Sequence, residues 1–325
     1  MDYYYDDFEL KSNTVFITIE NATIVISTIS LIFSLSVVFI LLYRYETLVF
    51  NKPLIAIVLF IAISDTLISL GYSFGYPTGI LCNIQGFLAE TFEKMSWIAT
   101  DFLMLNIYGI VVLKKVLVGA KLSCIITGFI VIVLIVIQYS VGVGYGNSKQ
   151  YDGISRCSFH SFTSSAHDNH LGNVFGSIQQ SIVVFTLVFI FLLLVRVLFF
   201  LNGSYKDAGN FTATQIFLAQ QAFSTMSLYP ASILICWLPS QILSIYQTIH
   251  DSSANASNQI LLNSFYILSP INGFIVSIIF YSKTTEAKKE WLSIFRQLKL
   301  VKETSDFEMR ESTSNVIVVR ITETE

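Results

Sequence analysis

Apolar residues in this chain gather in seven long runs, and most of the charged residues lie in the gaps between those runs. A helix that spans a membrane needs about 20 mostly apolar residues, because a rise of about 1.5 Å per residue has to cross about 30 Å of hydrocarbon. The pattern therefore predicts an all-α fold, a seven-transmembrane helix bundle. The expected spans are residues 24–43, 54–76, 83–113, 122–141, 173–201, 216–249 and 259–282.

Lysine and arginine are unevenly distributed over the segments between these runs. Short cytoplasmic loops of membrane proteins carry an excess of both residues. If the amino terminus is outside, only Lys11, Lys149 and Arg156 fall on outer segments. We therefore expect a multi-pass protein of the plasma membrane with an extracellular amino terminus and a cytoplasmic carboxyl terminus. The inner basic residues before the last span are Arg44, Lys52, Lys114, Lys115, Lys121, Arg196 and Lys206.

The remaining segments complete the predicted organisation. Residues 1–23 are expected to form an extracellular N-terminal segment, and residues 24–282 the seven-transmembrane domain. In residues 283–301, apolar positions recur at helical spacing among basic residues, which is typical of an amphipathic helix on the membrane surface; a short solvated helix is the alternative. Residues 302–325 are polar and are predicted to be a disordered cytoplasmic tail. Sequons at Asn21 and Asn255 fall on outer segments and are candidate glycosylation sites.

Composition narrows the function classes. Charged residues make up 13% of the chain, about half the share of roughly 25% in soluble domains. The net charge of −3 comes with no basic arm or nucleic-acid motif, so we expect no nucleic-acid partner. No metal-ligand spacing, nucleophile motif or phosphate-binding loop lies in the spans. We therefore expect no enzyme, no cofactor and no metal site.

The predicted topology separates the four cysteines. Cys82 and Cys157 fall outside, whereas Cys236 lies deep in the sixth span and Cys124 near the inner end of the fourth. Only the first two share an oxidising compartment. We expect a disulfide between them, with two free thiols as the alternative.

The third run carries unusual charges for a membrane span. Glu90, Lys94, Trp97 and Asp101 are spaced four, three and four apart and therefore share one helical face, with Glu93 beside it. Ionisable residues at membrane depth cost about 2.5 kcal/mol or more each, and they normally face a bundle interior or a water-filled cavity. Two interpretations stay open: an internal ion pair between Glu90 and Lys94, and direct contact with a ligand.

Polar residues on other spans are expected in the same outer half and predict an outer-facing ligand pocket. Each of them alone is more often a helix-packing hydrogen bond than a ligand contact. These residues are Gln179, Gln180, Gln241, Tyr246, Asn263 and Tyr266.

A second polar group is expected deeper in the membrane. Asp65 is predicted to pair there with Asp101, Asn106 or Asn272. Prolines within the sixth and seventh spans remove backbone hydrogen bonds, so each marks either a hinge or a static kink. They are Pro230, Pro239 and Pro270.

Short motifs carry a resemblance over most of the seven runs. The first is Cys82-Asn83-Ile84-Gln85-Gly86-Phe87, followed by Trp97, by Asn106-Ile107-Tyr108 and by Tyr145-Gly146 before Cys157. The later ones are Leu228-Tyr229-Pro230, Cys236-Trp237-Leu238-Pro239, and Pro270-Ile271-Asn272-Gly273-Phe274 continuing to Phe280-Tyr281. With these motifs the chain resembles the cyclic-AMP-receptor-like class of G-protein-coupled receptors of slime moulds and the related fungal glucose-receptor group.

The resemblance implies a receptor for an extracellular small-molecule or peptide ligand. The ligand would enter between the third, fifth, sixth and seventh helices, and a heterotrimeric G protein would engage the inner side at Lys114, Lys115, Lys121 and Arg196. The resemblance also implies the bridge between Cys82 and Cys157. Switch or core polar positions would be Asp65, Asp101, Asn106, Trp237, Pro239, Pro270 and Asn272.

Two motifs of rhodopsin-like receptors are absent from the sequence. Tyr108-Gly109 and Lys114-Lys115 stand where Asp-Arg-Tyr would end the third helix, and the seventh span has no Asn-Pro-x-x-Tyr. A membrane transporter, or a channel for ions or protons, is the alternative function, with the charges of the third span as its pathway. The odd number of spans and the lack of a duplicated half favour the receptor.

Overall fold

The computed structural model is built mainly of helices. It describes residues 3–49, 53–75, 79–140, 142–149, 155–161, 170–204, 223–250, 264, 267–284 and 288–289. The two strands are β1 (Val143–Lys149) and β2 (Ser155–Ser161). The labelled helices are α1 (Tyr3–Tyr43), α2 (Pro53–Tyr72), α3 (Ile80–Tyr108), α4 (Ala120–Ser140), α5 (His170–Ser204), α7 (Leu228–His250) and α9 (Leu268–Lys283).

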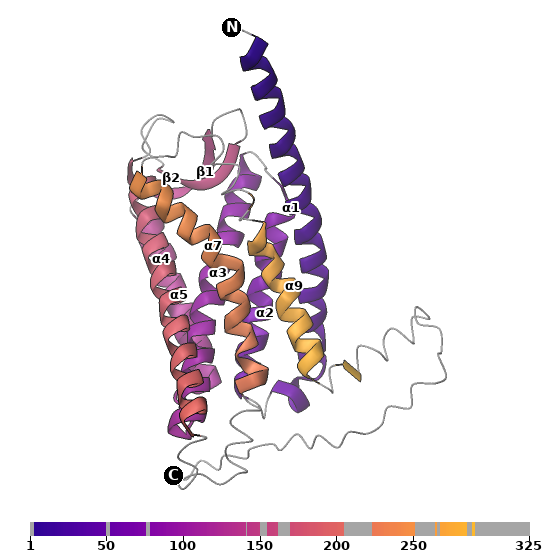
Figure 1. Cartoon of the computed structure of the whole chain (residues 1–325), viewed down its shortest axis with the longest axis vertical. Coiled ribbons are helices and arrows are strands. Elements are labelled where there is room, and N and C mark those ends of the chain that lie inside the picture. Colours follow the sequence, from indigo (N-terminus) through magenta and orange to yellow (C-terminus); the bar gives the residue numbers. More distant parts are fainter. Residues whose placement is uncertain are drawn as a thin grey trace, which may run out of the picture.

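The helices lie side by side in one elongated bundle (Figure 1). We call the end that carries β1 and β2 the hairpin end, and the opposite end, where α3 passes into α4, the loop end. Helix α3 contacts α2, α4, α5 and α7, whereas α9 packs on α1, α2 and α7. Helix α3 is thus the element best placed to connect polar groups of several helices.

Six described helices are long and apolar enough to cross a membrane. Large apolar side chains cover the outside of the bundle, as at Phe129 of α4 and Phe185 of α5, the latter 73% exposed. In lipid, apolar side chains face outward and polar side chains lie between the helices. The helices of this chain follow that arrangement, so the chain is a multi-pass helical membrane protein. The six helices are Ile17–Tyr43, Leu54–Tyr72, Ile80–Leu113, Ala120–Ser140, Gln180–Gly203 and Phe223–Leu243.

The first helix begins earlier than hydropathy predicted. Helix α1 starts at Tyr3 and extends past the hairpin end of the bundle, so most of the expected N-terminal segment is helical (Figure 1). Its apolar span already begins at Ile17. Asn21 is exposed but lies inside that span rather than before it. Acidic residues near the start of the chain lower its hydropathy without preventing a helix.

A β-hairpin lies between α4 and α5, where the sequence predicted only a loop. The strands β1 and β2 are antiparallel, with Val143 opposite Ser161 and Asn147 opposite Cys157. Both strands contact α3 and α5. Glycine and serine are frequent in this segment and have a low strand propensity, so packing against the helices outweighs local preference.

The three prolines differ in position. Pro239 lies inside α7. Residues 223–226 are helical, a turn at Ser227 interrupts the helix, and Pro230 lies in the first turn of α7. Pro270 likewise lies in the first turn of α9. Backbone hydrogen bonds from Ser227 N–H to the Phe223 carbonyl and from Ala231 N–H to the Ser227 carbonyl carry the ladder past the turn at Ser227, so Pro230 and Pro239 each remove one N–H from it.

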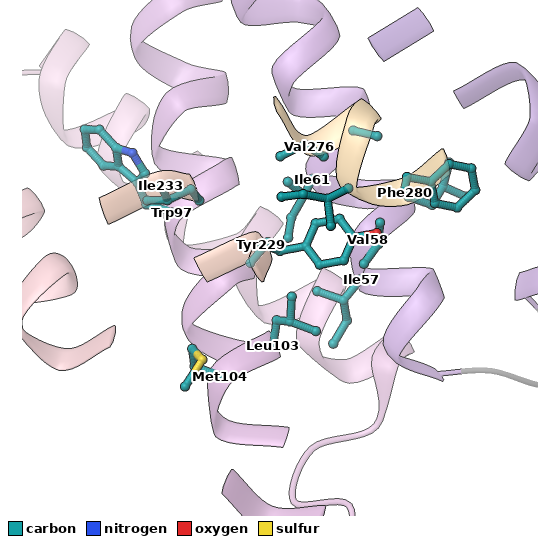
Figure 2. Close-up of a cluster of buried hydrophobic side chains, with 14 of the residues drawn as sticks. Ile57, Val58, Ile61, Trp97, Leu103, Met104, Tyr229, Ile233, Val276 and Phe280 are labelled. Carbon is teal, nitrogen blue, oxygen red and sulfur yellow. The ribbon is translucent and has the colours of Figure 1, made fainter. Parts of the chain in front are cut away.

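A hydrophobic core lies between the helices, and Figure 2 shows part of it. It joins side chains of α1, α2, α3, α5, α7 and α9, and Leu103 and Met104 of α3 are fully buried within it. The other labelled members include Ile57, Val58 and Ile61 of α2, Tyr229 and Ile233 of α7, and Val276 and Phe280 of α9.

Candidate functional site

A buried carboxylate at mid-bundle organises the first polar cluster. Asp65 of α2 is 2% exposed. Ser96 of α3 donates a hydrogen bond of 3.0 Å to its Oδ1, and Asn272 of α9 donates one of 3.1 Å to its Oδ2. The Ser232 hydroxyl of α7 lies 3.1 Å from Asn272 Oδ1. These contacts join α2, α3, α7 and α9 around one carboxylate.

Close packing of α1 and α9 extends this cluster. Ser69 of α2 donates a 3.1 Å hydrogen bond to Ser30 of α1. A Cβ on Gly273 would lie 2.7 Å from Ser30 Oγ and 3.3 Å from the Asp65 Cβ, so only glycine permits this approach of α9. We call Ser30, Asp65, Ser69, Ser96, Ser232 and Asn272 the Asp65 cluster.

The outcome for Asp65 confirms one of its three predicted partners. Asn272 binds Asp65 directly. Asp101 instead has Thr186 of α5 as its hydrogen-bonding neighbour, and Asn106 binds the loop after α3. Both lie further along α3 from Ser96, the α3 residue that reaches Asp65, so the helix carries them away from the carboxylate.

Two tryptophans meet at nearly the same depth along α3, since Trp97 directly follows Ser96. Trp97 of α3 and Trp237 of α7 pack edge to face, with ring centroids 5.0 Å apart and ring planes at 87°. Both are buried. Such pairs contribute about 0.5–1.5 kcal/mol beyond their area burial. This contact fixes the spacing between α3 and α7.

Ionisable side chains lie one turn of α3 above that contact. Lys94 Nζ is 3.6 Å from Glu90 Oε2. Glu93 is buried and close enough to Lys94 for a charge–charge interaction. The predicted internal ion pair is therefore present, and the predicted burial of this face is confirmed at Lys94 and Trp97.

Two buried polar atoms at this level have no hydrogen-bond partner among the described residues. They are Nε1 of Trp97, whose side chain is 4% exposed, and Oε1 of Gln241, whose side chain is 7% exposed. Gln241 lies one turn of α7 beyond Trp237, toward the hairpin end. A buried polar atom without a partner costs about 1–3 kcal/mol, so this level is incomplete as it stands. We call Glu93, Lys94, Trp97, Trp237 and Gln241 the tryptophan level.

The loop after α3 is held against the helix by a buried asparagine. Asn106 Oδ1 accepts hydrogen bonds from the backbone N–H groups of Leu117, at 3.2 Å, and Val118, at 3.0 Å. A Cβ on Gly109 would lie 2.6 Å from both the Lys115 carbonyl oxygen and the Leu117 side chain. The loop thus closes tightly over a π-helical turn, Gly109–Leu113, which ends α3.

Most of the predicted inner basic residues are exposed at the loop end, whereas Lys52 and Lys206 lie outside the described residues. Lys114, Lys115 and Lys121 surround the loop that Asn106 holds, and Arg196 is exposed on the loop-end half of α5. Lys114 has a left-handed backbone, with φ of 59°, which turns the chain sharply out of α3. The result is a basic surface at the loop end.

Other predicted site residues are less well placed or fall outside the description. Tyr246 is 49% exposed on α7, and Gln180 is partly buried on α5. Gln179 lies in α5, but its side chain is not among those described. Asn255, Asn263, Tyr266, and residues 290–301 of the predicted surface helix lie outside the described residues; Lys288 and Lys289 of that helix are helical and exposed.

The two outer cysteines lie on elements that touch. Cys82 is fully buried at the hairpin end of α3. Cys157 lies in β2, and β2 contacts α3. In the described part of the chain no three His, Cys, Asp or Glu side chains gather closely enough to hold a metal ion.

Sequence reasoning missed the small residues that complete these sites. Ser96, Ser232, Thr186, Gly109 and Gly273 drew no attention because hydroxyl and glycine residues are common in membrane helices. A usable signal existed for Ser96, which lies on the Glu93 side of the charged face of α3. No protein-family model and no curated protein matches this chain.

Proposed function

We propose that the chain is a seven-transmembrane G-protein-coupled receptor, which senses an extracellular ligand and activates a heterotrimeric G protein. In this proposal α9 is the seventh span, the hairpin end is extracellular and the loop end is cytoplasmic. The excess of lysine and arginine at the loop end supports that orientation.

The observation that carries the proposal is the course of α3. Midway along its length this helix bears the incomplete polar level around Trp97, and at the loop end it bears Asn106 and the basic loop. Ser96, the residue directly before Trp97, ties the helix to Asp65. One helix therefore connects a level with unpartnered buried polar atoms to a basic surface at the loop end.

Signalling by such a bundle requires two arrangements of the helices. A ligand shifts their equilibrium only by its difference in affinity for the two states. The contact of Trp97 with Trp237 links α3 to α7, and α7 contains Pro239, whose missing N–H weakens the ladder there. We propose that ligand binding changes this contact and that α7 moves relative to α3 at the loop end.

The bridge between Cys82 and Cys157 belongs to the same proposal. It would hold the β-hairpin over the hairpin end of α3, in the oxidising extracellular compartment. Peptide mapping of the purified protein without reductant tests it directly, since the bridge predicts one cross-linked peptide containing both residues. Recovery of both cysteines as free thiols overturns it.

Nucleotide exchange on heterotrimeric G proteins from the same source tests the function. The purified chain in lipid nanodiscs is expected to accelerate exchange in the presence of extracts that contain its ligand. Silence across ligand sources and G proteins, combined with solute flux in liposomes that Asp101→Asn abolishes, would replace the receptor by the transporter alternative.

The Asn106 brace supplies a sharper test of the partner surface. Asn106→Leu removes the oxygen that binds Leu117 and Val118, so we expect at least about a tenfold loss of exchange activity, which corresponds to about 1.4 kcal/mol. Asn106→Asp keeps an acceptor for both N–H groups and should retain most of the activity. Equal loss in both variants would show that the brace is not what matters.

A further inference from the structure

Asp101 is an acid within the membrane span of α3, and its two oxygens have different surroundings. Thr186 of α5 is its hydrogen-bonding neighbour. Its Oδ1 is buried and has no hydrogen-bond partner among the described residues. Each oxygen of the Asp65 carboxylate, in contrast, accepts a hydrogen bond. The hydrogen bonds at Asp65 suit an ionised group, whereas those at Asp101 are too few for one.

The side chains around Thr186 are apolar. Thr186 is buried, and so are Val183, Leu187 and Ile190 of the same helix, which belong to the hydrophobic core. Leu103, two residues after Asp101, is fully buried in that core as well. Burial of a charge without donors or a counter-ion is far more costly than burial of a neutral group. An ionised Asp101 would carry that cost at Oδ1.

Charged side chains on the helices packed against α3 lie away from Asp101. Among the described side chains of those helices, α2 has Asp65, α4 has Lys121, α5 has Arg196 and α7 has none. Lys121 and Arg196 are exposed at the loop end. Arg196 follows Thr186 by ten residues, which is about 15 Å of helix.

The other titratable groups on these helices are thiols and phenols, which are neutral at neutral pH. They are Tyr72 of α2, Cys124 and Tyr139 of α4, and Tyr229 and Cys236 of α7.

On α3 itself the other ionisable groups of the span lie toward the hairpin end. They are Glu90, Glu93 and Lys94. Lys94 precedes Asp101 by seven residues, which is about 10 Å along the axis. None of the described cations is therefore beside Asp101. A neutral carboxylic acid needs no cation, because its O–H donates one hydrogen bond and a threonine hydroxyl can accept it.

We propose that Asp101 is a protonation site that couples α3 to α5. In the arrangement described above, Asp101 is a neutral carboxylic acid whose O–H donates to Thr186 Oγ1. When the proton leaves for water, the O–H bond breaks and a carboxylate remains that lacks a donor at Oδ1. Ionisation thus favours an arrangement in which α5 moves away from α3 and water reaches Asp101. This inference rests on the proposed function for its second arrangement of the helices.

Infrared absorption detects the proposed proton directly. The C=O stretch of a neutral carboxylic acid is separate from the bands of ionised carboxylates and of backbone amides. The purified chain is measured at neutral pH in a detergent without ester groups, and the spectrum of Asp101→Asn is subtracted. We expect a positive carboxylic-acid band in the difference, because the variant lacks that group. A difference spectrum without this band overturns the inference.

Matched variants assign the band to one acid and one contact. Thr186→Ser keeps a hydroxyl acceptor and should leave the band in place, whereas Thr186→Val removes the acceptor and should shift it to higher frequency. Asp65→Asn, the same substitution at the acid whose oxygens are both bonded, should not remove the band. A band that only Asp65→Asn removes, or one at the same frequency in both Thr186 variants, contradicts the proposal.

The pH dependence of stability provides a readout that is independent of the spectrum. Unfolding exposes Asp101 to water, where an aspartate is ionised above about pH 5. The folded chain then holds one proton more than the unfolded chain, so stability falls as pH rises. From about pH 6 to about pH 8 the melting midpoint of the wild type should fall relative to that of Asp101→Asn. Parallel pH profiles of the two proteins would show that no such proton exists.

Nucleotide exchange tests the coupling to the helices. Wild-type activity should rise from about pH 6 to about pH 8 by at least about twofold more than that of Asp101→Asn, which has no proton to lose. The variant also corrects for any pH dependence of the G protein itself. Equal ratios in the two proteins would show that this proton does not control the arrangement.

Failure of this inference differs from failure of the receptor proposal. If the acid band belongs to Asp101 but no G protein responds to the chain, the protonation site stands and the receptor proposal is wrong. If Asp101→Asn leaves the infrared spectrum unchanged while the chain stimulates nucleotide exchange, the receptor stands and the protonation site is wrong.

Discussion

The Asp65 cluster and the tryptophan level are both buried and both contain polar side chains, but they differ in whether those polar atoms have hydrogen-bond partners. In the first, each oxygen of the Asp65 carboxylate accepts a hydrogen bond from a different helix. In the second, Trp97 Nε1 and Gln241 Oε1 have no partner among the described residues. Both clusters include residues of α3 and α7, so the difference does not come from separate parts of the bundle.

The difference indicates a division between support and recognition. A satisfied buried network rigidifies a structure, because breaking any member leaves its partners unpaired. In a network with unpaired polar atoms, a ligand that supplies the missing hydrogen bonds gains binding free energy from them. Stability measurements on matched variants therefore distinguish the two clusters without knowledge of the ligand.

The largest loss is expected at the carboxylate itself. Asp65→Ala leaves the Ser96 hydroxyl and the Asn272 amide without their acceptor and should lower the free energy of unfolding by about 3 kcal/mol. Thermal unfolding in detergent micelles measures it. Ser64→Ala is the control, since this buried hydroxyl bonds to the Phe60 carbonyl of its own helix and its loss should cost little.

Gly273 tests the packing that supports the same cluster. Gly273→Ala forces α9 away from Ser30 and Asp65, and overpacking of this kind costs about 1–3 kcal/mol. Gly128→Ala in α4 is the matched control, because a Cβ there meets nothing within 4 Å. The same melting assay should show a lower midpoint for the first variant and an equal or higher one for the second.

Gln241 provides the opposite result at the tryptophan level. Gln241→Leu removes a buried oxygen that has no partner, so stability in the absence of ligand should stay within about 1 kcal/mol or increase. Asn272→Leu, an amide lost from the satisfied cluster, should cost about 2 kcal/mol in the same assay. If both substitutions lower the free energy of unfolding equally, the two clusters do not differ in their contribution to stability.

The smallest effect is expected from the ion pair. Glu90 is partly exposed, so solvent weakens its interaction with Lys94. A double-mutant cycle with Glu90→Gln and Lys94→Gln should give a coupling free energy of about 0.5 kcal/mol. A coupling above about 2 kcal/mol would make this pair a structural element like Asp65 and would weaken the case for a ligand there.

Some features of the site were accessible from residue spacing. The spacing of Glu90, Lys94 and Trp97 predicted one interior face of α3, and the structure buries Lys94 and Trp97 and pairs Lys94 with Glu90. Asn272 was named among the partners of Asp65. These predictions succeed because a helix in lipid has to turn its ionisable side chains inward whatever its neighbours are.

Other features depended on which helices become neighbours. Asn106 was expected near Asp65 but binds a loop 11 and 12 residues later, which follows from the tight turn at Gly109 and Lys114. The β-hairpin was not expected, because its strands are held by α3 and α5 rather than by strand-forming residues. Contacts of this kind cannot be predicted from the local sequence.

The sequence alone determined that the chain is helical, that most of its helices suit a membrane, and that the charges of α3 face inward. The reason is that hydrocarbon imposes the same demands on every helix, so hydropathy and spacing suffice. Only the tertiary structure decided that the Asp65 carboxylate is satisfied by Ser96 and Asn272, 31 and 207 residues away, while Trp97 and Gln241 are not. Hydrogen bonding is directional and short in range, so it is fixed by how helices pack against one another.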